Sequence, residues 1–150
     1  MSTEGDSVDP DVLIGKRVGG VTASWLINET GVHELIHVWL NIEGLGGVRI
    51  HTHNGIRLDL SEPHDPYEMP ELATQVVVER RAPAPLEAIV GQVIDGVSRL
   101  QAEGYGVRVG FVLNTNVGGV AIADVGDDLV IGSWPDPARW SAVEVALDEI

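Results

Sequence analysis

The chain has 150 residues, a hydrophobic fraction of 44% and a formal net charge of −14 at pH 7. That hydrophobic fraction is ordinary for a folded domain and too high for an intrinsically disordered chain. No apolar run approaches the roughly 20 residues that cross a bilayer, so no membrane partner is expected. Strong acidity also disfavours nucleic acid, because binding phosphates needs lysine and arginine. The charge favours a basic partner protein, while its dispersal along the chain equally suits a role in solubility.

The first eleven residues are acidic and polar, and the sequence predicts a disordered tail over residues 1–11. This segment lacks the basic start and apolar core of a signal peptide. The chain has no cysteine, which agrees with a reducing compartment. We therefore expect a cytoplasmic protein in which residues 12–150 form a single β domain.

An internal repeat organises the rest of the chain. Residues 13–21 and 89–97 share a glycine, an apolar residue three positions later, and then a Gly-Val pair. Each segment is followed by apolar strands, a Gly-Gly-Val turn (46–48 and 118–120) and a proline-containing stretch. This order of features predicts two copies of one strand-rich unit, copy one at about 12–82 and copy two at about 86–150.

Alternating apolar and polar residues predict strands in both copies. Over residues 32–42 most apolar side chains fall on the even positions, with histidines at 33 and 37 among the odd ones. Asn54-Gly55 is a strong hairpin signal. We expect a β-meander in each copy. Two such meanders predict a mainly β sandwich or barrel with approximate two-fold pseudo-symmetry and few short helices.

Two segments stay open between helix and strand. Residues 86–100 carry a helical stripe, but Gly91 and Gly96 would each weaken a helix. We expect a helical turn at 86–90 that leads into a strand. In residues 137–150 the Asp-Pro pair at 136–137 fits a helix start. The corresponding segment of copy one, around Val77, resembles a strand, so a strand is preferred there too.

Residues 33–37 read His-Glu-Leu-Ile-His and match the HExxH signature of zinc metalloproteases. That chemistry needs a helix, so that both imidazoles reach one zinc ion while the glutamate polarises water. His64, Asp65 or Glu68 would be candidates for the third ligand. The strand alternation and the absence of these residues from copy two indicate a coincidental match. We expect no enzyme and no cofactor.

The strand interpretation gives the histidines a different role. If residues 43–47 form a hairpin loop, residue 42 faces residue 48, His37 faces His53 and Trp39 faces His51. These four side chains would then share the outward face of one hairpin. Three interpretations stay open: a solvated polar face, a protein-binding patch centred on an exposed Trp39, and a metal site formed by His37, His51 and His53. Protonation of neighbouring histidines would make such a patch sensitive to pH.

Apolar strands separated by glycines occur throughout most of the chain, at residues 15–21, 32–50 and 89–131. The pattern resembles small, duplicated, β-rich bacterial proteins of unknown function, among them predicted immunity proteins of polymorphic toxin systems. The resemblance implies a non-enzymatic role and supplies no catalytic residues. It agrees with the acidity, since a negative surface complements a basic toxin.

The leading functional hypothesis is therefore a non-enzymatic protein-binding module, an acidic inhibitor or immunity-type partner of a basic protein. Trp39, with Trp134 and Trp140, would make the contact. The alternative is a small-molecule or metal-binding β domain that uses the histidine face or the cleft between the copies, and a metalloprotease ranks third. Unpaired edge strands also allow a homodimer.

Overall fold

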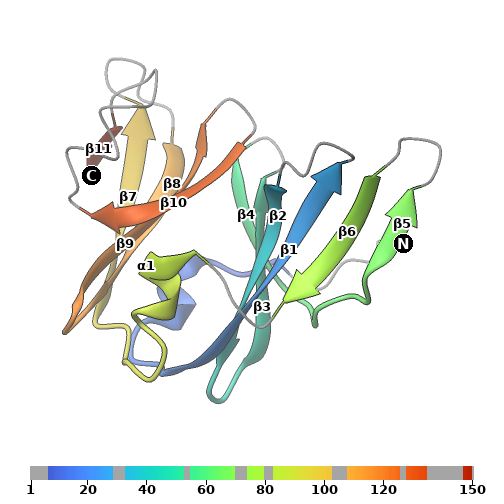
Figure 1. Cartoon of the computed structure of the whole chain (residues 1–150). Helices are drawn as coiled ribbons and strands as arrows, with labels where there is room; N and C mark the ends of the chain where they lie inside the picture. Colours follow the sequence, from blue (N-terminus) through green and yellow to red (C-terminus); the bar gives the residue numbers. More distant parts are fainter. Residues whose placement is uncertain are drawn as a thin grey trace.

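The structure is a computed structural model that describes residues 7–28, 33–52, 55–69, 74–79, 83–102, 108–125, 128–134 and 147–149. Its strands form two antiparallel sheets, which confirms the predicted mainly β class (Figure 1). The first sheet contains, in spatial order, β4 (Ile56–Leu60), β3 (Gly46–Thr52), β2 (His33–Ile42), β1 (Val18–Asn28), β6 (Thr74–Glu79) and β5 (Tyr67–Met69). The second contains β10 (Asp128–Trp134), β9 (Gly118–Val125), β8 (Arg108–Thr115), β7 (Gly96–Ala102) and β11 (Leu147–Glu149).

The two sheets have the same strand order around their first strand. A meander runs from β1 to β4 and another from β7 to β10, and a later strand, β6 or β11, pairs with the free side of β1 or β7. The sheets pack on a common core as a sandwich, and the described strands close no barrel. Descent of the two halves from one duplicated unit stays a prediction.

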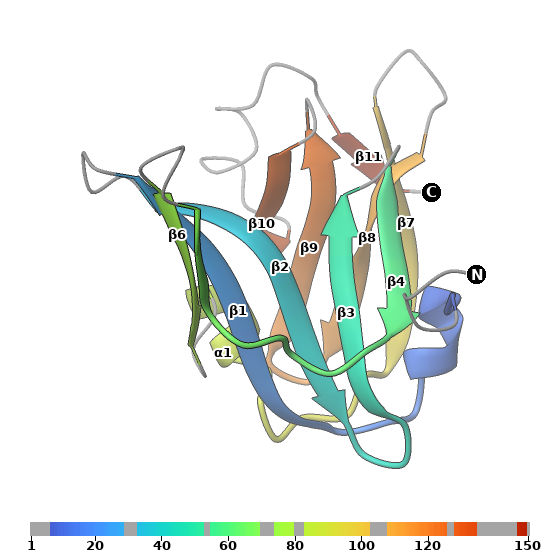
Figure 2. The same cartoon turned by 90° about the vertical axis from the view of Figure 1, so that its right-hand side faces the viewer.

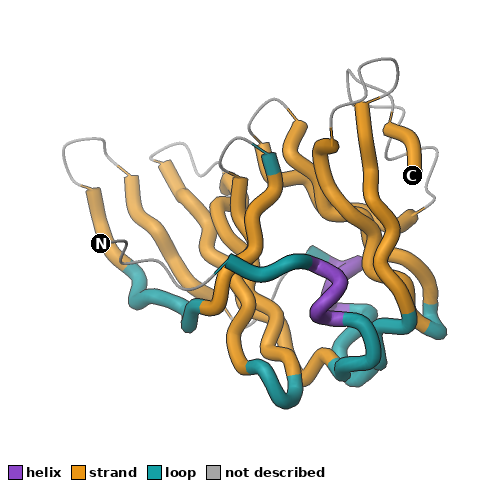
Figure 3. The backbone as a smooth tube through the Cα atoms, turned by 180° about the vertical axis from the view of Figure 1, so that it is seen from behind, coloured by secondary structure: helices purple, strands orange, loops and turns teal. Residues whose placement is uncertain are grey.

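Short helices lie at one end of the space between the sheets (Figure 3). The 3-10 helix η1 (Pro10–Leu13) precedes β1, and α1 (Ala84–Glu87) lies between β6 and β7. The segment 86–100 therefore combines a helical turn with a strand, as predicted, and the described part of 137–150 is the strand β11. No helix in the described ranges has the length and apolarity to cross a membrane.

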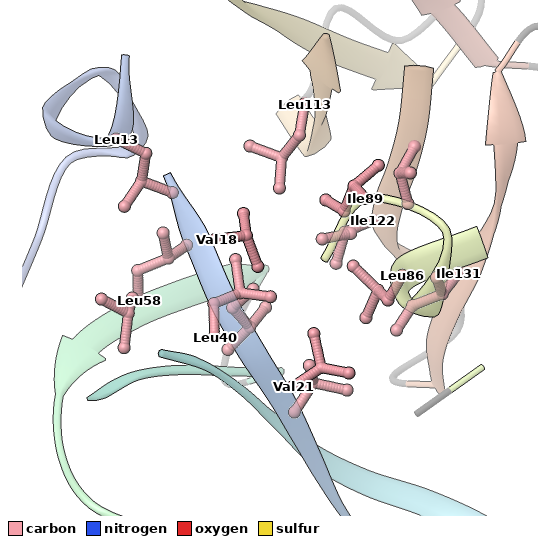
Figure 4. Close-up of a cluster of buried hydrophobic side chains, with 14 of the residues drawn as sticks. Leu13, Val18, Val21, Leu40, Leu58, Leu86, Ile89, Leu113, Ile122 and Ile131 are labelled. Carbon is pink, nitrogen blue, oxygen red and sulfur yellow. The ribbon is translucent and has the colours of Figure 1, made fainter. Parts of the chain in front are cut away.

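The core lies between the facing sheets and follows from the alternation along each strand (Figure 4). Even-numbered residues point inward from Val38 to Ile42 in β2 and from Val120 to Ile122 in β9, so that Leu40 and Ile122 are fully buried. Leu13 of η1 and Leu86 and Ile89 in and after α1 close one end of this cluster. Because most of the cluster comes from strands of both halves, neither sheet buries its apolar face without the other.

A second buried cluster lies on the opposite face of the five-stranded sheet. Leu100, Val112, Ala121 and Ala123 form it, and the two alanines alternate along β9 with the core residue Ile122. Both faces of this sheet are therefore apolar at its centre.

The sequence predicts a disordered tail over residues 1–11, but the last five of these residues are part of the fold. Residues 1–6 lie outside the described ranges, but Ser7 pairs with Asp59 of β4, and the Val8 amide donates to the Leu58 carbonyl at 2.9 Å. Arg99 of β7 forms ion pairs with Asp9 at 3.0 Å and Asp11 at 3.2 Å. The charges that suggested a solvated tail are thus partly paired, and residues 7–11 belong to the fold.

Candidate functional site

The segment from Ser61 to Pro66, which we call the strap, crosses the outer face of the first sheet (Figure 2). It must do so because it joins β4 and β5, which are the two opposite edges of that sheet. Its first residues are held close to β3: the Ser61 amide donates to the Gly47 carbonyl at 3.1 Å, and the Gly47 amide donates to Glu62 Oε1 at 3.2 Å. A Cβ on Gly47 would lie 2.5 Å from the Ser61 carbonyl oxygen, so only glycine allows this approach.

The hairpin beneath the strap has a different register from the predicted one. The loop contains three residues, 43–45, with Gly46 at φ 91°, and Ile42 faces Gly46. The Leu45 amide donates to the Ile42 carbonyl at 3.0 Å, which closes the turn early. Trp39 therefore faces Arg49, and the prediction that it faces His51 is wrong. The turn from Ile42 to Leu45 has Gly44 at φ 82° in its third position, as a type II turn requires, and Gly46 follows at positive φ. The loop therefore needs only three residues, whereas five were assumed.

The aromatic side chains on this face gather under the strap, as rings from β2, β3 and the strap itself. The His37 ring centroid lies 5.6 Å from that of Trp39, 5.7 Å from that of His51 and 6.0 Å from that of His64. His64 also lies 5.4 Å from Trp39 and 5.4 Å from Tyr67, measured between ring centroids. Three of the four predicted site residues are thus brought together, and His53 lies outside the described residues.

The expectation of an exposed tryptophan patch is wrong for Trp39, which is only 2% exposed. The side chain points to the outer face as predicted, but the strap and its neighbours cover it. Trp134 is partly buried on the second apolar cluster, and Trp140 lies outside the described residues. Strand alternation gives the face of a residue but not what later crosses that face, and the proline-containing stretch 61–66 was the available signal.

A buried ion-pair network lies beside the aromatic cluster. Arg49 Nε and Nη2 donate to the two carboxylate oxygens of Asp59 at 3.0 and 2.7 Å, and His51 Nε2 lies 3.2 Å from Asp59 Oδ2. Asp59 is 4% exposed and His51 8%. A two-pronged, buried Arg–Asp pair is one of the stronger geometries for a charged contact. It anchors β3 to β4 and fixes the position of the His51 ring.

His37 is held in its neutral form. Burial lowers the pKa of His37 from its ordinary 6.5 to about 4, and the positive charge of Arg49 and the neighbouring rings of His51 and His64 act in the same direction. The carboxylate of Asp59 opposes the shift but does not outweigh it. At neutral pH the imidazole therefore offers one hydrogen-bond donor and one acceptor.

Two ring nitrogens of this cluster have no hydrogen-bond partner within the described part of the chain. They are His37 Nδ1 and Trp39 Nε1, and both are buried. Buried polar atoms are nearly always paired, so each such exception calls for a water molecule or a ligand group. Trp39 Nε1 can only donate, and therefore requires an acceptor.

A groove of about 750 Å³ runs between the strap and the outer face of the sheet, and we call it the strap groove. Trp39 and His64 line it together with carboxylate residues of the strap and of α1. The full lining is Gly19, Gly20, Val21, Thr22, Trp39, Asn41, Gly47, Glu62, Pro63, His64, Asp65, Pro66, Val78, Glu87 and Val90. A Cβ placed on Gly20 would meet no atom within 4 Å, so this glycine leaves open space at the groove. The groove was not predicted, because its walls come from segments far apart in sequence.

The HExxH match falls within β2, an extended strand, so residues 33–37 do not have the helical spacing that the zinc motif needs. Of its proposed third ligands, His64 lies in the aromatic cluster. Within the described ranges, no three histidine, aspartate or glutamate side chains are grouped so as to hold a metal ion.

Comparison of this chain with known protein families, curated proteins and solved structures found no match.

Proposed function

We propose that this protein is a non-enzymatic binding domain that takes a small ligand in the strap groove. The observation that carries the proposal is the strap groove itself, a hollow of about 750 Å³ between the strap and the outer face of the sheet. This volume falls within the range of roughly 300–1,000 Å³ that is typical of ligand pockets. Thr22, Asn41 and His64 are polar residues of its lining.

The burial of Trp39 favours this function over the protein-binding patch expected from the sequence. An interface hot spot needs an accessible side chain, and Trp39 is covered. A small molecule, in contrast, can occupy the groove without contact to the Trp39 side chain, against lining residues such as Gly20 and Asp65.

The experiment is a thermal-shift survey of small polar compounds with wild type, Gly20→Leu and Gly96→Leu. Gly20→Leu fills the groove without crowding an existing atom, and Gly96→Leu makes the same change at another open strand position away from the groove. A compound at 100 times its Kd stabilises the folded state by about 2.7 kcal/mol. We expect compounds that raise the Tm of wild type and of Gly96→Leu but not that of Gly20→Leu.

Compounds that stabilise all three proteins equally would contradict the proposal, and so would a survey in which none stabilises wild type. If Gly20→Leu does not fold, Thr22→Leu takes its place, since Thr22 lines the groove on the same strand as Gly20. Loss of the shift in Thr22→Leu then supports the proposal, and an unchanged shift overturns it.

The immunity-type role is a second candidate, and the net charge of −14 favours it. It requires a basic protein, and electrostatic attraction to such a partner weakens as salt rises. Co-expression with the product of the neighbouring gene tests it. A salt-sensitive complex that Gly20→Leu leaves intact would favour this candidate over the groove, because the contact would then lie elsewhere on the acidic surface.

A further inference from the structure

The N-terminal residues 7–11, which we call the latch, lie across the seam where an edge of the first sheet meets the second sheet (Figure 2). The latch extends the first sheet, since Ser7 pairs with Asp59 of the edge strand β4. The Val8 amide also donates to the Leu58 carbonyl at 2.9 Å. An edge strand can accept the backbone of any extended chain in this way. The side chains of the seam therefore decide which chain it accepts.

Arg99 of β7 gives the seam a preference for acidic segments. Its Nη2 lies 3.0 Å from Asp9 Oδ1 and 3.2 Å from Asp11 Oδ1, and its side chain is only 20% exposed. Apart from the latch, the described residues that line the seam include a second arginine, Arg57, and no carboxylate. A guanidinium that is largely withdrawn from water needs carboxylates in place of its hydration. The occupant of the seam has to supply them.

The latch fills the seam incompletely. A hollow of about 220 Å³ lies between the latch and the strands, with Val8 of the latch, Ile56 of β4 and Gly110 of β8 in its wall. Val8 packs against the core cluster but is only partly buried. Because protein interiors leave few voids larger than a water molecule, valine is smaller than the space available to it. A larger apolar side chain at this position would bury more surface and gain contacts.

The latch is also held weakly, although the chain that follows it is firmly anchored. The side chains of Asp9 and Asp11 are 66% and 61% exposed, and ion pairs with exposed partners contribute little stability. Leu13, in contrast, is fully buried in the core. The latch can therefore leave the seam while Leu13 keeps its place between the sheets.

We infer that the seam is a docking groove for an extended acidic segment of a partner protein, and that the latch occupies it as a weak internal substitute. The partner segment adds a strand to β4, brings a carboxylate to Arg99 and fills the hollow with an apolar side chain larger than valine. A second copy of this chain would bring the same valine and leave the same hollow, so a different protein fits better. The seam and the strap groove share no described lining residue, so this inference does not depend on the proposed function.

Fluorescence anisotropy with the full-length protein and three labelled peptides tests the inference. The first peptide has the sequence of residues 7–11 between glycines, the second carries Val8→Phe, and the third carries Val8→Phe, Asp9→Asn and Asp11→Asn. The second should bind about fivefold more tightly than the first, the effect of burying roughly 40 Å² more apolar surface. The third should not bind detectably, because it offers Arg99 no carboxylate. In Arg99→Gln the second peptide should lose this advantage over the third.

The latch competes with the peptides, since a tethered segment acts at a roughly millimolar effective concentration. The full-length variant Asp9→Asn/Asp11→Asn weakens the latch and keeps the oxygen that accepts from the Asp11 amide. It should bind the second peptide about three- to tenfold more tightly than wild type does, the range for the loss of two exposed ion pairs. The control Glu68→Gln/Asp128→Asn removes two exposed charges elsewhere and should bind as wild type does.

Equal binding of the second and third peptides overturns the inference, and so do equal affinities of the two double variants or failure of every protein to bind the second peptide. If the weakened-latch variant binds no peptide but forms a dimer in gel filtration, the occupant is a second copy and the inference is wrong. If circular dichroism shows that this variant does not fold, Asp11→Asn takes its place, with an expected gain in affinity of about two- to fivefold. An unchanged affinity of Asp11→Asn would then overturn the inference.

Discussion

The outer faces of the two sheets differ although the strand order around β1 and β7 is the same. On the first sheet the outer face carries His37, Trp39 and a buried ion pair beneath the strap. On the second sheet the corresponding face carries the apolar cluster around Val112. The shared strand order thus provides two similar faces, and the residues on them together with the strap make the first one polar and the second one apolar. The following changes test this contrast.

The largest effect is expected when the apolar outer face is given a charge. Val112→Asp places an unpaired carboxylate among side chains that are fully buried, and should lower the free energy of unfolding by more than about 4 kcal/mol. Urea unfolding followed by circular dichroism measures it. Val117→Asp, at the exposed β8–β9 turn, is the matched control and should cost less than about 0.5 kcal/mol. Similar losses in both variants would mean that the second cluster does not stabilise the fold.

The polar face depends instead on paired charges. Asp59→Ala leaves Arg49 without its carboxylate in a site where both side chains are mostly buried, and should cost about 3–5 kcal/mol. Asp11→Ala breaks an ion pair with Arg99 in which the carboxylate is exposed, and should cost less than about 1 kcal/mol. Equal losses in urea unfolding would show that burial does not distinguish the two pairs.

The strap distinguishes the two halves, and Gly47 is where it approaches the sheet most closely. Gly47→Ala would drive a methyl group into the Ser61 carbonyl, and should cost about 1–3 kcal/mol while it loosens the strap. Gly20→Ala meets open space and should change stability by less than about 0.5 kcal/mol. Proteolysis of the strap provides the second measurement: faster cleavage is expected in Gly47→Ala only, and identical cleavage of both variants would contradict the tight contact.

The smallest effect concerns pH. Because the pKa of His37 falls from 6.5 to about 4 on folding, the unfolded chain binds a proton between these values and the folded protein does not. Stability is therefore full above pH 6.5 and falls as the pH drops toward 4, by about 1 kcal/mol between pH 6 and pH 5. His37→Gln should give a flatter profile in urea unfolding across that window. Parallel profiles of wild type and variant would show that His37 does not titrate as the geometry requires.

Much of the fold can be predicted from the sequence because the residues that determine it are close together in the chain. Period-two alternation predicts the strands, and Asn54-Gly55 predicts a hairpin at that position. In the structure β3 ends at Thr52 and β4 starts at Ile56. The grouping of His37, Trp39 and His51 on one face also followed from alternation. The register did not follow, since it depends on which glycines of the loop take a positive φ, here Gly44 and Gly46. The burial of Trp39 depends on where residues 61–66 pass: their prolines indicate a segment outside the strands, but its path follows from the positions of β4 and β5 at opposite edges of the sheet.

The strap has a consequence for the order of folding. The meander from β1 to β4 needs only short loops, whereas β6 reaches β1 after the chain has crossed the whole sheet, so that residues such as Trp25 and Val77 meet over a long sequence separation. Closing long loops is entropically costly, so this pairing is expected late. Amides of β1 that bond to β6 should then exchange with solvent sooner than those that bond to β2. The strap groove would be completed only at this last step, when the strap crosses a sheet that has already formed.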